Sequence, residues 1–183
     1  FSYVEMIGYI GLVPFLLSLF TLLIKSKSPH IKFFWGTVII SLLLSLKTPI
    51  ANLLFWLRLP IFSSASPARI ISLVSFSLAI LAGFGLDHLL KLNRQLVKKF
   101  LIIIAAIFGI LWFITFALHL SVSQRNLILP TTLFMAFVMV ILFIRNTRYV
   151  ILATLLLILS AADLYRFHHK FTPYTDRKFL YPQ

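Results

Sequence analysis

A basic residue at the start of an apolar helix is the first candidate for chemistry in this sequence. Ser66 and Pro67 have the form of a helix start, because serine caps free N–H groups and proline fits the first helical position. Arg69 lies two residues after Pro67, in the first turn of the predicted helix. Free N–H groups, the helix dipole and a guanidinium together suit a phosphate, and Lys47 and Arg58 are candidates for the same anion site. The alternative is that all three cations only reach lipid headgroups, as interfacial Lys and Arg ordinarily do.

The candidate acids for proton transfer are Glu5 and Asp163. A carboxylate near the outer face of a membrane can act as the base that deprotonates an acceptor. The alternative is that both acids cap helix ends or pair with arginine. His168 and His169 have no further ligand at a recognisable spacing, so we expect no metal site, and the glycines form no phosphate loop. No cofactor is expected.

The composition indicates that these residues sit in a membrane protein. Hydrophobic residues make up 61% of the 183 residues and charged residues only 11%, whereas soluble domains are roughly half apolar and about a quarter charged. The net charge of +13 indicates basic loops in contact with anionic lipid, not nucleic acid. There is no cysteine, which excludes disulfides and thiolate metal sites.

The elements that must position the candidate residues are therefore membrane helices. We expect an all-α bundle of about six spans over residues 1–165. The predicted spans are 6–24, 33–46, 68–86, 100–120, 127–144 and 149–162. Segment 33–46 is so short that it spans only if Lys32 and Lys47 extend to opposite interfaces or if the bilayer thins locally; the alternative is a re-entrant segment. Segment 49–59 is predicted to lie in the interface, and 166–183 to begin an extracytoplasmic domain or tail.

The distribution of Lys and Arg predicts the orientation. Most of them fall in the connections 25–32, 87–99 and 145–148, which share one side. That side is predicted to be cytoplasmic, so the helix start at Arg69 faces outward. Because the chain begins at Phe1 without a signal sequence, we expect it to be an internal fragment of a longer protein.

The helix predicted after Pro67 has one face of small residues. Ser72, Ser75, Ala79 and Gly83 recur at three- and four-residue spacing. Such a face lets membrane helices approach closely, so we predict that neighbouring helices pack there. Phe76 falls on a different face, which is predicted to meet lipid or bulky neighbours.

A series of short motifs runs along the chain in a fixed order. They are Tyr3-Val4-Glu5, Tyr9 to Pro14, Thr48-Pro49, Leu59 to Phe62, Pro67-Ala68-Arg69, Leu81 to Asp87, Ala162-Asp163-Leu164, Arg166-Phe167 and Thr172-Pro173. Together they resemble the bacterial YfhO-type membrane protein family. Between Leu101 and Ile158 the resemblance is one of hydropathy only.

The resemblance implies a protein related to the GT-C glycosyltransferases. Such enzymes take a sugar from a polyprenyl-phosphate carrier on the outer face of the bacterial cytoplasmic membrane, and this family is linked to glycosylation of cell-envelope polymers. The resemblance implies a lipid-phosphate site near Arg69, with the catalytic acids upstream of Phe1.

Two other functions stay open at this stage. One is a transporter or flippase for a lipid-linked saccharide. A re-entrant 33–46 segment would favour it, whereas the absence of an acid or base in the middle of a predicted span counts against it. The other is a purely structural membrane bundle.

Overall fold

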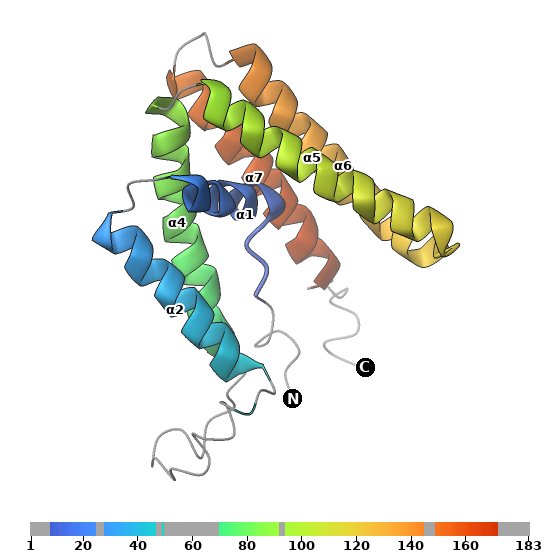
Figure 1. Cartoon of the computed structure of the whole chain (residues 1–183), viewed down its shortest axis with the longest axis horizontal. Helices are drawn as coiled ribbons and strands as arrows, with labels where there is room; N and C mark the ends of the chain where they lie inside the picture. Colours follow the sequence, from blue (N-terminus) through green and yellow to red (C-terminus); the bar gives the residue numbers. More distant parts are fainter. Residues whose placement is uncertain are drawn as a thin grey trace, which may run out of the picture.

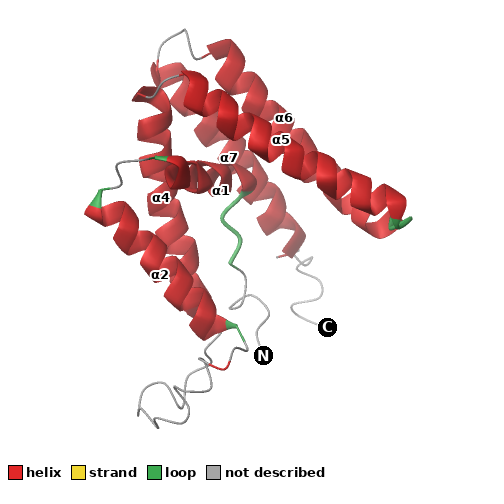
Figure 2. Ribbon diagram, viewed as in Figure 1, coloured by secondary structure: helices red, strands yellow, loops and turns green. Residues whose placement is uncertain are grey.

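The computed structural model describes residues 8–24, 28–46, 49, 70–91, 94–144 and 149–171. Every regular element in these ranges is helical, which confirms the expected all-α class (Figure 2). The elements are α1 (Leu12–Phe20), the 3₁₀ helix η2 (Thr21–Leu23), α2 (Pro29–Ser45), α4 (Ile71–Lys91), α5 (Arg94–Ala117), α6 (Ser121–Ile144) and α7 (Tyr149–Phe171).

Four of the described helices are long and apolar enough to cross a membrane. They are Ile71–Lys91, Gln95–Ala117, Ser121–Leu142 and Val150–His169. The expected count of about six spans is not confirmed. The segments predicted as spans 6–24 and 33–46 contain only the shorter apolar helices Leu12–Leu23 and Pro29–Ser45.

Local backbone geometry explains why the first predicted span is short. Gly11 has a φ of 87°, a left-handed conformation that a helix interior does not contain. At the other end Ile24 is extended, with φ −75° and ψ 118°. The helical stretch between them covers ~18 Å at ~1.5 Å per residue, less than a ~30 Å hydrocarbon core.

Several helices also run beyond their predicted apolar segments. Helix α4 continues to Lys91, and α7 continues to Phe171. Helix α6 begins at Ser121, so Pro130 lies inside it and not in its first turns. Hydropathy marks the apolar part of a helix, whereas polar residues can extend the same helix past that part. The expected interfacial helix 49–59, apart from Pro49, and residues 172–183 lie outside the described residues.

Helix α1 is the most enclosed element of the fold. Figure 1 shows it running across α4, and it also contacts α6 and α7. Val13 and Phe20 have no exposed surface, and Leu16 and Leu17 are buried with them. A short helix thus forms the centre of the main hydrophobic core, to which α4, α5, α6 and α7 contribute the surrounding side chains.

The close approach between α1 and α4 occurs at Gly85. A Cβ atom on this glycine would overlap the backbone carbonyl of Leu17, so only glycine allows α1 to cross there. The predicted packing face is therefore wrong. Ser72, Ala79 and Gly83 are exposed, and the buried residues of α4 are Val74, Ser77, Leu78, Leu81, Ala82, Gly85 and Leu89.

Two further packing units complete the fold. Helix α2 lies against α4 through a second apolar cluster that includes Ile31 and Val38. Helices α5 and α6 form a hairpin that extends away from α4 (Figure 1). Phe108 and Phe134 stack between the two helices, with ring centroids 5.1 Å apart. Much of the hairpin exposes bulky apolar side chains, such as Phe113 at 73%.

Candidate functional site

Asp163 is a buried carboxylate on α7, with 4% of its surface exposed. Its Oδ2 accepts a hydrogen bond of 2.8 Å from the backbone N–H of Leu12. The Tyr9 hydroxyl lies 2.8 Å from both carboxylate oxygens and donates to them. The carboxylate therefore joins α7 to the first turn of α1 across more than 150 residues of sequence.

The start of α1 explains why the carboxylate is needed there. The N-cap residue is Gly11, which has no side chain to accept a hydrogen bond from the free N–H groups of the first turn. Asp163 supplies the missing acceptor from a helix that is distant in the sequence. Its negative charge also interacts favourably with the positive, N-terminal end of the α1 dipole. A Cβ atom at Gly11 would lie 3.3 Å from Asp163 Oδ2, so glycine also leaves room for the carboxylate.

Tyr9 lies in the coil ahead of α1, outside the four candidate spans. Its ring stacks on Phe167, with centroids 4.1 Å apart. Desolvation by burial, together with the hydrogen bond to Asp163 and the charge on it, raises the pKa of the Tyr9 phenol above its ordinary value. The phenol therefore keeps its proton and remains a hydrogen-bond donor to the carboxylate.

These contacts are those of a helix cap contributed by another helix. They correspond to the capping alternative considered for Asp163, while its role as a catalytic base stays a prediction. The structure places Asp163 inside the candidate span Val150–His169 and not beyond its end. A buried carboxylate in a candidate membrane span is a candidate functional group, because desolvating a charge there is costly.

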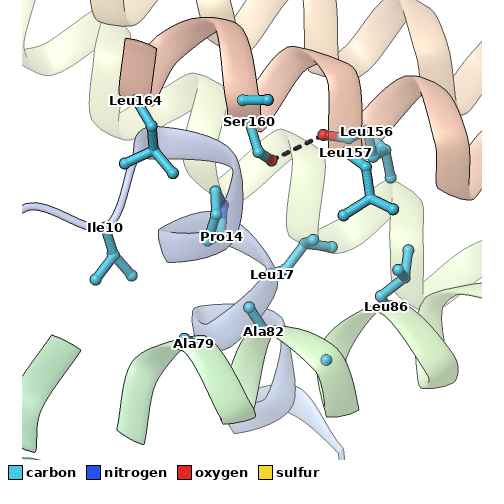
Figure 3. A pocket seen from close by; sticks show the side chains of 12 residues that line it. Ile10, Pro14, Leu17, Ala79, Ala82, Leu86, Leu156, Leu157, Ser160 and Leu164 are labelled. Carbon is cyan, nitrogen blue, oxygen red and sulfur yellow. Dashed lines mark hydrogen bonds between the residues drawn. The ribbon is translucent and has the colours of Figure 1, made fainter. Parts of the chain in front are cut away.

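An apolar groove of about 420 Å³ lies between α1, α4 and α7. Figure 3 shows Pro14 and Leu17 of α1 at its floor, between Ala79, Ala82 and Leu86 on one side and the α7 residues on the other. The exposed small residues Ala79 and Gly83 therefore line this groove. The small-residue face of α4 leaves space where close helix packing was predicted.

The chemistry of the groove fits an aliphatic chain. Ser160 is the one polar side chain among the described residues that line it, and its hydroxyl donates to the Leu156 carbonyl oxygen at 2.7 Å. Figure 3 shows Ile10 and Leu164, the sequence neighbours of Tyr9 and Asp163, at the same end of the groove. The groove and the buried carboxylate thus belong to one region of the molecule.

Most of the site residues predicted from sequence lie outside the described residues. These are Glu5, Lys47, Arg58 and Arg69. Asp163 is described, and it is brought together with Tyr9, a contact that sequence reasoning missed. Among the described residues, no group of three or more His, Asp or Glu residues is placed to hold a metal ion.

No family model, no curated protein and no solved structure matches this chain.

Proposed function

We propose that this chain is the membrane-embedded part of a GT-C-like glycosyltransferase of the bacterial cytoplasmic membrane. In this proposal the groove between α1, α4 and α7 holds the isoprenoid chain of a polyprenyl-phosphate-linked sugar. The observation that carries the proposal is an apolar groove among candidate membrane helices with no free polar side chain among its described lining residues. The outer face, the carrier and the cell-envelope acceptor come from the sequence resemblance.

Small side chains give the groove its capacity for a branched chain. Ala79 and Gly83 from α4 and Ala161 from α7 leave space that larger residues would fill. A Cβ atom built on Gly83 has nothing within 4 Å. Because isoprenoid chains carry a methyl branch on each unit, a groove with small walls suits them, and its lack of polar groups favours hydrocarbon over a hydrophilic ligand.

The phosphate is proposed to bind at the N-terminal end of α4. Arg69 precedes the first residue of α4, Ile71, by two positions in the sequence. The groove reaches Ala79, which lies ~12 Å along the helix from Ile71 at ~1.5 Å per residue. A chain in the groove can therefore place its phosphate near this helix start, where Arg69 offers a bidentate contact and Lys47 and Arg58 add positive charge.

The test compares two glycines that both have open space around the position of a Cβ atom. Gly83 lines the groove and Gly109 on α5 does not, and a Cβ atom at either has no neighbour within 4 Å. Gly83→Leu should lower donor turnover in membranes by about tenfold, because the side chain occupies the groove. Gly109→Leu at matched protein level should leave turnover unchanged. Equal turnover in both variants would contradict the groove as the carrier site.

A second variant tests the phosphate end of the same proposal. Arg69→Lys keeps the charge but removes the planar fork that bonds two phosphate oxygens. We expect weaker use of the polyprenyl-phosphate donor, with normal membrane insertion. If Arg69 only reaches lipid headgroups, lysine is an adequate replacement and turnover stays at the wild-type level.

One observation favours a transporter or flippase for a lipid-linked saccharide as the second candidate. Helices α1 and α2 are too short to count as candidate spans. Asp163 lies buried within the candidate span Val150–His169 on α7. Short helices and intramembrane acids both occur at transporter sites. Reconstituted vesicles separate the two functions: movement of the lipid-linked saccharide between leaflets without sugar transfer would favour the transporter.

A further inference from the structure

A second apolar groove lies between α5 and α6, away from the groove next to Asp163. Its volume is about 330 Å³. Helix α5 contributes Leu101, Ile102 and Ala105 to its walls, and α6 contributes Phe134, Met135 and Val138. The small side chain of Ala105 leaves the space between these larger neighbours. Such a groove on an exposed hairpin accommodates a hydrocarbon chain that lies along the helices.

One end of this groove carries a single cation. Lys98, near the start of α5, lines the groove together with Leu142 near the end of α6. Lys98 is exposed. No carboxylate in the described part of the chain pairs with it, since Asp87 forms an ion pair with Lys91 and Asp163 accepts hydrogen bonds from Tyr9 and Leu12. The groove is therefore apolar along its length and positive at one end.

We propose that this groove binds an anionic glycerophospholipid. One acyl chain lies between α5 and α6, and the phosphate pairs with the Lys98 ammonium. Charge complementarity selects this occupant, because the site offers the Lys98 ammonium at one end and hydrocarbon contacts elsewhere. A zwitterionic lipid carries no net charge and gains less from the same ammonium. The proposal does not depend on the proposed glycosyltransferase activity.

The experiment uses the chain reconstituted in phosphatidylcholine vesicles with a trace of phosphatidylglycerol that carries a diazirine in one acyl chain. After illumination, mass spectrometry of the digested protein locates the labelled residues. We expect labels from the phosphatidylglycerol probe at Leu101, Ile102, Met135 and Val138. A phosphatidylcholine probe with the same diazirine should label these positions less, and equal labelling by both probes would overturn the proposal.

Matched variants test the charge and the space separately. Lys98→Gln should lower phosphatidylglycerol labelling of the groove by about fivefold, the effect of one cation near an anionic surface. Lys99→Gln, an exposed neighbour that does not line the groove, should have much less effect. An equal loss in both variants would mean a diffuse attraction to the basic end of the hairpin and would contradict a specific site.

The space is tested with two alanines on α5. Ala105 lines the groove, while Ala106 is exposed and does not. Ala105→Leu should remove most of the labelling between α5 and α6, and Ala106→Leu should preserve it. Circular dichroism in the same vesicles checks that both variants keep their helices. If Ala105→Leu folds and still labels like the wild type, the acyl chain does not lie in this groove.

Discussion

The region around α1 and the hairpin of α5 and α6 differ in how much of their apolar surface is buried within the chain. Helix α1 is short and enclosed. Helix α4, which α1 crosses, has 39% of its candidate span buried. The hairpin helices are long, yet only 22% and 17% of their spans are buried. Length and apolar character therefore do not predict enclosure by the chain. The bulky side chains that the hairpin exposes are suited to an apolar environment such as a lipid bilayer.

This difference also separates two kinds of binding surface. The groove next to Asp163 is built on a floor of buried helix, so its dimensions depend on contacts within the chain. The groove next to Lys98 lies on the exposed hairpin. We therefore expect substitutions at the buried residues of α1 to change stability strongly, and substitutions on the exposed faces of the hairpin to change it little.

The largest expected contrast is between two phenylalanines. Phe20 has no exposed surface and Phe113 is 73% exposed. Phe20→Ala should lower the free energy of unfolding by about 3–5 kcal/mol, because it leaves a cavity beside Phe100. Phe113→Ala should cost less than about 1 kcal/mol if lipid replaces the lost contacts. Reversible unfolding in mixed micelles measures both, and equal losses would contradict the assignment of buried and lipid-facing regions.

The next contrast compares Gly85 with Gly83 on the same helix. Gly85→Ala should destabilise the fold by about 1–3 kcal/mol, since the added Cβ atom overlaps the Leu17 carbonyl and forces α1 and α4 apart. At Gly83, where nothing lies within 4 Å, alanine should be neutral or stabilise by up to about 1 kcal/mol through helix propensity. Thermal unfolding in detergent gives the order, and a tolerated Gly85→Ala would contradict the crossing of α1 and α4.

Asp163 provides the third contrast. Asp163→Ala should cost about 1–3 kcal/mol, because the Leu12 N–H and the Tyr9 hydroxyl lose their acceptor. Asp87→Ala should stay within about 1 kcal/mol, since the ion pair between Asp87 and Lys91 is solvent-exposed. Asp163→Asn retains an acceptor oxygen and should recover much of the stability. If that variant is stable but has lost sugar transfer, Asp163 acts as more than a cap.

The smallest expected contrast uses two similar hydrogen bonds. The Trp35 indole donates to Thr21 Oγ1 at 2.8 Å near α1, and the Trp112 indole donates to Thr131 Oγ1 at 3.0 Å in the hairpin. Thr131→Val should cost about 0.6 kcal/mol, the average for such bonds in membrane proteins. Thr21→Val should cost more, because Thr21 is fully buried. Unfolding in detergent measures both, and the reverse order would contradict the comparison.

The sequence predicted the helical class and four of its predicted spans overlap the four candidate spans of the structure, because long apolar segments have few alternatives in a membrane. It could not predict that α1 is a short enclosed helix, since this depends on the φ angle of Gly11 and on a carboxylate contributed by α7. The predicted packing face that includes Gly83 was wrong for a similar reason, because α1 crosses α4 at Gly85. Both glycines lie on an all-apolar helix, and only the path of α1 distinguishes them.

The contact of Asp163 with Tyr9 joins residues 154 positions apart. No local pattern predicts such a contact. The groove depends in the same way on three helices that are separate in the sequence. The predicted cation site at Lys47, Arg58 and Arg69 lies outside the described residues and stays a prediction.

The most direct test of the proposed carrier site locates a polyprenyl phosphate on the protein. A photoreactive polyprenyl phosphate and a photoreactive phosphatidylcholine are cross-linked to the reconstituted chain, and the labelled residues are identified by mass spectrometry. We predict that the polyprenyl probe labels Ala79, Leu157 and Ala161 in the groove next to Asp163. The phosphatidylcholine probe should label the exposed hairpin residues, such as Phe113 and Met139. The same distribution of labels from both probes would contradict the account.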